Sequence, residues 1–219
     1  MSVYFVAGSG TDVGKTYVTA ELVRRLREAG RAVQALKPVA SGVASLDDPA
    51  FAASDTAVLL EAQGLEVTPQ TVDACTPWRF RAPLSPDMAA AAEGRALPAA
   101  EVAAWIRGCI AAAAPGTVTL VEGVGGVMSP MAEDALNLDL IKAVACPVIL
   151  VGGSYLGALT HTLTALETLK AHSVALDRVV LNETRGSTVG FEATAATLAR
   201  FAGGIRLTCV RYGGTLELD

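Results

Sequence analysis

A glycine-rich segment near the N-terminus, Gly8–Thr16 with the sequence GSGTDVGKT, constrains the fold of this chain more than any other feature. It lies between the apolar run 3–7 and a helical pattern that begins at Lys15. A strand, a glycine loop and a helix in this order form a phosphate-binding loop, because the backbone N–H groups and the helix N-terminus attract phosphate oxygens. An ordinary glycine turn that caps a helix is the alternative, and the flanking strand and helix patterns argue against it. The segment therefore predicts nucleoside triphosphate binding.

The loop is one residue longer than the usual motif. Four residues normally separate the first glycine from the Gly-Lys pair, and Ser9 stands at that position here. Counted from Gly8, five residues precede the pair Gly14-Lys15. The chain therefore carries a variant loop, in which Lys15 can reach the outer phosphates and Thr16 can bind Mg²⁺.

Composition favours one α/β domain that spans residues 1–219. The chain has 219 residues, of which 52% are hydrophobic, and this is ample for a large core. A net charge of −5 argues against a nucleic-acid surface. No apolar run approaches the ~18 residues of a membrane span, and the N-terminus lacks a signal-type pattern, so we expect a cytoplasmic protein. Four cysteines without a CxxC pair or a histidine cluster predict neither a zinc site nor disulfides.

Strand-like and helix-like segments alternate along the chain. Strands are predicted at 3–7, 32–36, 117–121, 147–151 and 178–181, and more weakly at 71–76 and 204–209. Helices are predicted at 15–29, 55–63, 86–93, 98–113, 136–145, 157–172 and 190–201. This alternation predicts a mostly parallel sheet with helices on both faces. Ligands bind such sheets beyond the carboxyl ends of the strands, where functional residues are expected.

Two charged residues follow predicted strands. Lys37 begins the segment KPVASG, whose proline, serine and glycine favour a shaped loop that holds the amine near anions over a solvated lysine. Glu122 follows the strand 117–121 in the segment EGVGG. A carboxylate at the tip of a buried strand is costly unless it is paired, and Mg²⁺ near the phosphates would pair it. Glu122 is therefore predicted to be the Walker B acid, with a plain turn as the alternative.

Other polar residues leave two interpretations open. Asp55 follows Ser54 at the start of a short helix, where capping is as probable as a functional role. Asn182 ends the strand 178–181 and can present a donor and an acceptor to a nucleobase, or simply form a turn. His161 and His172 have no partner at catalytic spacing and are interpreted as structural or surface residues.

The motifs GTDVGKT, KPVASG, SD before a short helix, APLSPDMAA, VEGVGG and LGALTHTLTALE, in this order, resemble the dethiobiotin synthetase family. The resemblance runs from the first strand to about Asn182. It implies a single P-loop α/β domain with a roughly seven-stranded, mostly parallel sheet, and a homodimer. It also implies that 7,8-diaminononanoate, CO₂ and Mg-ATP are converted to dethiobiotin, ADP and phosphate through a carbamate and a carbamic-phosphoric anhydride. The partners implied are these small molecules, with no nucleic acid and no membrane.

The resemblance also implies roles for single residues. Mg²⁺ would be held by Thr16, Asp55 and Glu122, and the catalytic residues would be Lys15, Lys37 and Thr11. Nucleotide binding would involve Asp12, Val13, Gly14, Lys15, Thr16, Tyr17 and Asn182. Substrate binding would involve Thr11, Lys37, Ser41, Gly123, Val124, Gly125, Gly157 and Thr160. The start of the helix at Gly157 would come from the partner subunit and receive the substrate carboxylate.

The sequence departs from the family pattern at two places. Thr160 stands where an asparagine is usual, so a side-chain amide is missing at the carboxylate site. The segment 204–207 lacks the usual proline of a turn that borders the purine, and looser selection among nucleoside triphosphates is expected.

A switch ATPase of the partition type is the competing interpretation. Such proteins usually carry an extra lysine early in the loop, where this chain has Ser9 and Gly10, and no basic face or amphipathic membrane helix is evident. Glutamine-dependent amidoligases of the same branch need a second domain with a cysteine nucleophile, for which too little chain remains.

Overall fold

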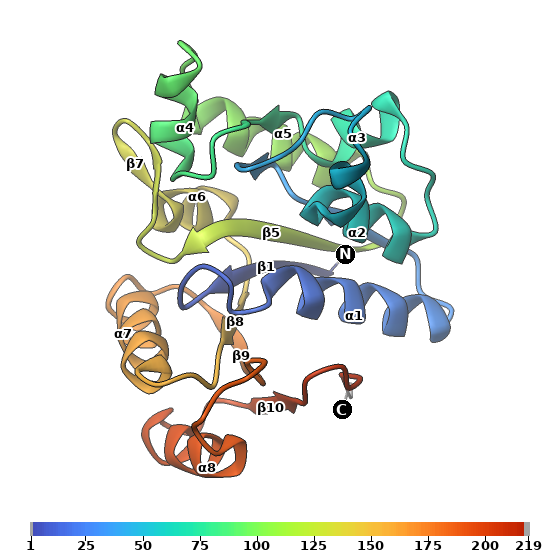
Figure 1. Ribbon diagram of the computed structural model, residues 1–219. Helices are drawn as coiled ribbons and strands as arrows, with labels where there is room; N and C mark the ends of the chain where they lie inside the picture. The colour runs from blue at the N-terminus through green and yellow to red at the C-terminus, as the bar shows by residue number, and fades with distance from the viewer. Residues whose placement is uncertain (1, 217–219) are drawn as a thin grey trace.

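The computed structural model describes residues 2–216 and shows a parallel sheet between two layers of helices (Figure 1). Every strand pair in this sheet is parallel. Its six strands, in spatial order, are β10 (Leu207–Val210), β9 (Leu176–Asn182), β8 (Val148–Gly152), β1 (Ser2–Gly8), β5 (Val118–Gly126) and β2 (Val33–Leu36).

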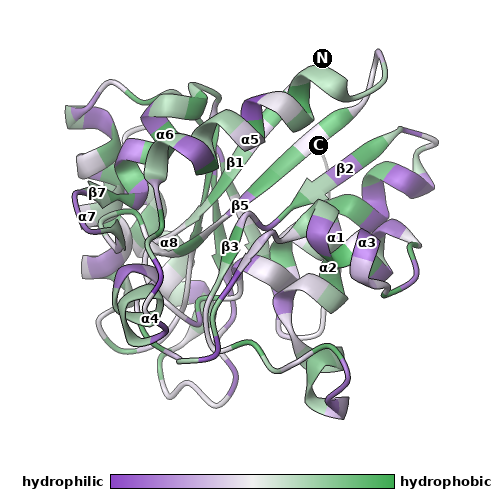
Figure 2. Cartoon of the chain, turned by 90° about the horizontal axis from the view of Figure 1, so that it is seen from above, coloured by the Kyte–Doolittle hydropathy of each residue, from purple (hydrophilic) through white to green (hydrophobic). Residues whose placement is uncertain are grey.

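The helices divide between the two faces of the sheet. Figure 2 shows α1, α2 and α3 on one side and α5 to α8 on the other. Their bounds are α1 Lys15–Glu28, α2 Asp55–Gln63, α3 Pro69–Cys75, α4 Pro86–Ala92, α5 Ala99–Ala112, α6 Asn137–Val144, α7 Ala158–Ala171 and α8 Phe191–Phe201. Shorter elements are a 3₁₀ helix at Pro49–Ala53, the parallel pair β3 (Val39–Ala40) and β4 (Trp78–Arg79), and the antiparallel hairpin β6 (Pro130–Ala132) and β7 (Ala135–Leu136). No helix within residues 2–216 has the length and hydropathy of a membrane span.

Apolar side chains on both faces of each strand explain this layered arrangement. Successive residues of a strand point to opposite faces. In β1, Phe5 and Ala7 belong to the core under α5 to α8, whereas Val6 belongs to the core under α1 and α2. All five residues of β8 are buried. The continuous apolar run at 147–151 is therefore the pattern of a parallel strand that is covered on both sides.

The structure confirms the predicted fold class and corrects two details. The sheet has six strands within the described residues, where the family resemblance implied roughly seven. The weakly predicted strand at 71–76 is wrong, because this segment lies in helix α3. Thr68 and Thr71 form a reciprocal capping box at its start, and Pro69 occupies the first helical position, so local hydrogen bonds outweigh the β-type composition.

The capping box gives a testable consequence for stability. Thr68→Ala removes the side-chain oxygen that accepts from the Thr71 backbone N–H, and we expect a loss of about 1 kcal/mol in the free energy of unfolding. Urea denaturation followed by circular dichroism measures this loss. Thr68→Ser keeps the oxygen and should stay close to the wild type. Equal stability of both variants and the wild type would contradict the capping role.

Candidate functional site

The phosphate loop requires glycine at two positions because of close approaches. Gly14, the N-cap of α1, has φ of 87°, and a Cβ there would lie 2.1 Å from Asn182 Nδ2. A Cβ on Gly8 would lie 2.7 Å from the Gly10 carbonyl oxygen. Asp12 also has positive φ, of 57°, which short polar side chains tolerate better than others. The loop is thus a tightly folded turn at the positive end of a helix.

Lys15 lies in the first turn of α1 and faces this loop. Its Nζ donates a hydrogen bond of 3.0 Å to the Gly10 carbonyl. Burial and the nearby charge of Lys37 together lower the pKa of Lys15 to about 8. A phosphate bound in the loop would stabilise the charged form of this amine and raise its pKa.

Lys37 follows β2 and forms a buried ionic cluster with two carboxylates. Its Nζ lies 2.7 Å from Glu122 Oε1 and 2.9 Å from Asp55 Oδ2, and it donates 3.0 Å to the Gly123 carbonyl. Burial alone would lower the pKa of Lys37, but the two carboxylates outweigh it and raise that pKa. Burial likewise opposes ionisation of Asp55, and Lys37 brings the pKa of Asp55 below its usual value. The two carboxylates therefore favour the charged form of Lys37.

Glu122 lies within β5, rather than after the strand as the sequence suggested, and its side chain is fully buried. Thr16 Oγ1 donates 2.7 Å to Glu122 Oε1. Glu122 Oε2 has no hydrogen-bond partner among the described residues, although it is buried. A buried carboxylate oxygen without a partner is costly and indicates a ligand.

The oxygens of Thr16, Asp55 and Glu122 form a set that fits Mg²⁺. This ion usually takes one or two carboxylates, while phosphates and water complete its octahedron. No group of three or more His, Cys, Asp or Glu side chains within residues 2–216 forms a metal cage. A cation bound here would thus depend on nucleotide phosphates for further ligands.

A cavity of about 530 Å³ brings most of the predicted site residues together. Ten of them line it, namely Thr11, Asp12, Gly14, Lys15, Thr16, Lys37, Ser41, Asp55, Val124 and Gly125. Sequence reasoning missed its rim residues Ala40, Gly42, Val43, Ala53 and Ser54, which carry no charge. Of these, only Ser54 has a recognisable sequence pattern, that of a helix N-cap. Its side chain caps α2 and accepts a hydrogen bond from the Ala57 backbone N–H. Asp55 begins this helix, so capping by Ser54 and pairing of Asp55 with Lys37 occur together.

Seven predicted residues do not line this cavity. Val13 is buried in the core, and Glu122 and Gly123 lie in β5, where they accept hydrogen bonds from Lys37. Asn182 ends β9 and donates 3.2 Å to the Val13 carbonyl. Tyr17 donates its hydroxyl to the Gly214 carbonyl.

The remaining predicted residues, Gly157 and Thr160, lie at the start of α7, away from the cavity. Gly157 is the N-cap of this helix, with φ of 95°. Nearby, His161 has a partner that the sequence did not reveal, because its Nδ1 lies 2.7 Å from the Tyr155 hydroxyl oxygen. His161 lines a second cavity of about 450 Å³ together with Ser9, Gly10 and Thr11 of the phosphate loop.

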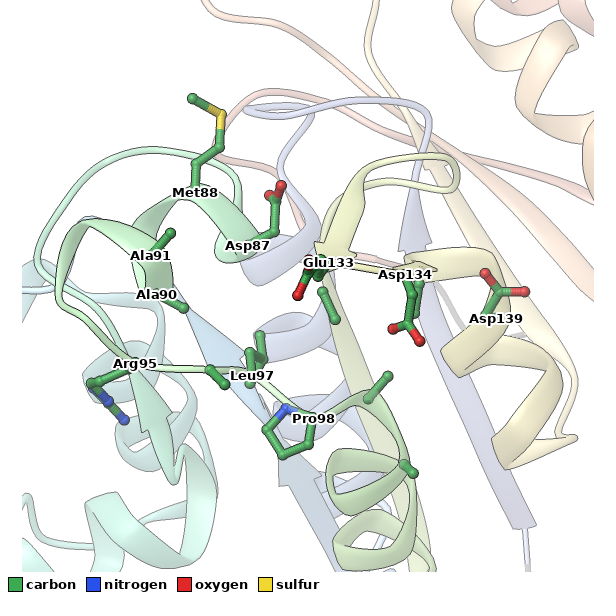
Figure 3. Close-up of a pocket in the computed structure, with 15 residues that line it drawn as sticks. Asp87, Met88, Ala90, Ala91, Arg95, Leu97, Pro98, Glu133, Asp134 and Asp139 are labelled. Carbon is green, nitrogen blue, oxygen red and sulfur yellow. The ribbon is translucent and has the colours of Figure 1, made fainter.

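A larger cavity, of about 1240 Å³, lies between α4 and the β6–β7 hairpin. Figure 3 shows the carboxylates of Asp87, Glu133, Asp134 and Asp139 along it, while Arg95 points away from them. These negative charges would repel phosphate oxygens. The phosphate loop, Lys15 and Lys37 instead identify the smaller cavity as the candidate site.

A parallel α/β sheet, a glycine loop from β1 to α1, and Lys15 and Thr16 beside a strand-borne glutamate define a P-loop NTPase. A family model described as an AAA domain (AAA_26) matches residues 2–216. A Methylobacterium nodulans protein named ATP-dependent dethiobiotin synthetase BioD is 59% identical over 98% of this chain and 95% of that protein. A Phenylobacterium zucineum protein of the same name is 47% identical over 98% of this chain and 90% of that protein. This chain belongs to the ATP-dependent dethiobiotin synthetase family.

Solved structures agree on the fold alone. The signal recognition particle receptor FtsY from Elizabethkingia anophelis has a TM-score of 0.52 at 14% identity, over 95% of this chain and 58% of that chain. The MinC:MinD cell division complex of Aquifex aeolicus matches with a TM-score of 0.54 at 11% identity, over 96% of this chain and 81% of that chain. The P-loop architecture is therefore shared by proteins of unlike function.

The buried ion pair predicts a strong, non-additive effect on stability. Lys37→Met leaves Glu122 buried without its cation and should lower the free energy of unfolding by about 3–5 kcal/mol. Adding Glu122→Gln removes the orphaned charge, so the double variant should be more stable than Lys37→Met. Urea denaturation at neutral pH measures both.

Lys142→Met serves as the matched control, because this lysine is exposed in α6, and a change of about 0.5 kcal/mol or less is expected. Strictly additive losses for the two buried substitutions would contradict the pairing.

Proposed function

We propose that this chain closes the ureido ring of dethiobiotin from 7,8-diaminononanoate and CO₂, with ATP converted to ADP and phosphate. The observation that carries the proposal is the position of Lys37. Asp55 and Glu122 hold its ammonium group in a cavity that the phosphate loop also lines. A second fixed cation opposite Lys15 suits an anionic acceptor that meets the γ-phosphate. The names and identities of the relatives support the same reaction.

The reaction needs no protein nucleophile. One amine of the substrate adds to CO₂ and loses a proton, which gives a carbamate. A carbamate oxygen then attacks the γ-phosphorus, and ADP leaves. The second amine attacks the carbonyl carbon of the resulting anhydride, and phosphate leaves as the ring closes. Catalysis on this route consists of positioning and charge neutralisation.

The residues of the cavity suit these steps. Lys15 and the backbone N–H groups of residues 12–17 would neutralise the phosphates, and Lys37 would hold the carbamate. Thr11 and Ser41, which line the same cavity, would orient the acceptor. Thr16, Asp55 and Glu122 would hold Mg²⁺, which when bound neutralises charge on the phosphates.

The remaining assignments follow the family pattern. Asn182 and the loop would bind the nucleotide, and the segment Gly123–Gly125 would contact the diamine. The N-terminus of α7, with Gly157 and Thr160, would receive the substrate carboxylate through backbone N–H groups and the helix dipole. We place residues 1–219 in one P-loop domain, active in the cytoplasm without nucleic acid or membrane.

We also propose that two copies of the chain pair through the end of the molecule that carries α4 and α7. Both helices lie at this end in Figure 1, beyond the carboxyl end of β5. Apolar side chains are exposed before and within α4 (Leu84, 43%, and Met88, 54%), after β5 (Met128, 50%) and before α7 (Leu156, 88%). A second copy would cover them and bring its α7 toward the diamine.

Purified protein incubated with 7,8-diaminononanoate, bicarbonate and Mg-ATP should form the cyclic urea, with one ADP per ring. Mass spectrometry detects the ring, and a coupled assay counts ADP. Omission of the diamine should abolish most ATP turnover. ATP turnover that instead depends on DNA or a protein partner would favour the partition-type switch ATPase and contradict the proposal.

The pairing surface predicts a change of mass in solution. Leu156→Glu places a charge on the proposed contact and should convert a dimer to a monomer, as measured by light scattering. Leu65→Glu changes an apolar side chain of 47% exposure between α2 and α3, and it should leave the dimer intact. A wild-type monomer, or equal behaviour of both variants, would contradict this surface.

A further inference from the structure

Another cavity, of about 550 Å³, is lined by three arginines. Arg79, Arg81 and Arg95 lie around it, and Glu93 is the single carboxylate among its lining residues, which define the arginine cavity. Three positive charges against one negative charge give this lining a net charge of +2. The whole chain carries −5, so the cluster is a local reversal of charge. A concave surface of this kind attracts anions.

Two of the three arginines are held in place by the protein. Arg95 Nη1 donates 2.9 Å to the Arg79 carbonyl, and the Arg95 guanidinium lies 4.6 Å from the centroid of the Phe80 ring. Arg79 Nη2 lies 2.8 Å from Asp73 Oδ1, and Arg79 Nη1 donates to the Thr76 carbonyl. These contacts restrict both side chains before any ligand binds, which lowers the entropic cost of binding.

The guanidinium of Arg81 is the one with donors to spare. Its Nη2 lies 3.5 Å from Ser45 Oγ, and no carboxylate of residues 2–216 forms an ion pair with it. Glu93 accepts 2.6 Å from the Arg81 backbone N–H, but its other oxygen lies 3.3 Å from Arg95. A guanidinium presents a planar fork of N–H donors that matches two oxygens of one anion.

The arginine cavity adjoins the segment that lines the candidate site. Val43 lines both cavities. Gly42 N donates 3.0 Å to the Ala82 carbonyl, and Val43 N donates 3.0 Å to the Phe80 carbonyl. Arg81 lies between these two acceptors, so its backbone is held against the segment that borders the catalytic cavity.

We propose that the arginine cavity binds a phosphate-type oxyanion, at a site separate from the phosphate loop. Arg81 and Arg95 donate to the anion, and Arg79 adds charge beside them. A net charge of +2 matches the dianion that a phosphate group forms near neutral pH, whereas a single carboxylate would balance half of it. Leu46 and Phe51 also line the cavity, which gives the anion an apolar border. This site does not depend on the reaction proposed above.

Nuclear magnetic resonance of the arginine Nε–H groups tests the site, because each guanidinium gives its own signal. The full chain is saturated with Mg-AMP-PNP, a non-hydrolysable ATP analogue that occupies the phosphate loop, and inorganic phosphate is then titrated at constant ionic strength. We expect the Arg81 and Arg95 signals to follow one saturable binding curve. Arg81→Gln should weaken phosphate binding about tenfold, as for the loss of a charged hydrogen bond.

Two variants separate a charge effect from a change of folding. Glu93→Gln keeps an oxygen that can accept from the Arg81 backbone N–H and removes the negative charge of the lining, so it should tighten phosphate binding about threefold. Arg200→Gln changes an exposed arginine of α8 outside the cavity and should leave phosphate binding unchanged. Shifts that do not saturate, or equal phosphate affinity in the wild type and Arg81→Gln, overturn the site.

A second probe distinguishes the sources of the phosphate group. Phenyl phosphate carries the same dianion on an apolar ring and is titrated under the same conditions. Tighter binding than inorganic phosphate supports a phosphorylated organic molecule as the ligand, because the ring then contacts the apolar border. Equal binding supports free phosphate. Saturable shifts of equal size in Arg81→Gln with either probe would overturn the role of the arginine cluster.

Discussion

The buried pair of Lys37 and Glu122 is the constraint on which the rest of the site depends. Two charges in a protein interior are tolerated only when their geometry and hydrogen bonds compensate the lost hydration. Here Lys37 Nζ lies 2.7 Å from Glu122 Oε1, and Thr16 donates to the same oxygen. Because β5 lies between β1 and β2, Glu122 has the phosphate loop on one side and Lys37 on the other. The strand order β1, β5, β2 thus places Glu122 between Lys15, which follows the loop after β1, and Lys37, which follows β2.

The pKa values of the two lysines of the site are shifted in opposite directions. Lys37 has two carboxylate neighbours that raise its pKa, whereas Lys15 has a pKa lowered to about 8 by burial and by Lys37. The two carboxylates therefore favour the charged form of Lys37. The charged form of Lys15 would be stabilised by a bound anion such as phosphate. Lys37 already has such a counter-charge, because Asp55 and Glu122 lie beside it. Such fixed charges stabilise transferred phosphate without reorganisation during the reaction.

The sequence predicts the position of those site residues that lie at the carboxyl ends of strands. In a parallel sheet the carboxyl ends meet at one edge, so Lys37 and Glu122 could be placed near the loop before any coordinates. Contacts between distant or irregular segments could not be predicted. The bond between Tyr155 and His161 joins a loop to a helix, and that between Tyr17 and Gly214 spans the chain. Neither has a periodic pattern, because each depends on how whole elements pack.

The extra residue of the phosphate loop lies in its early part, which borders two cavities. Asp12 adopts positive φ, which turns the backbone sharply within the loop. Thr11 then projects at the boundary of two cavities, because it lines both the 530 Å³ cavity with Lys37 and the 450 Å³ cavity with His161. A loop of standard length would have one residue fewer between Gly8 and Gly14 to reach this boundary. The longer loop thus borders two separate cavities.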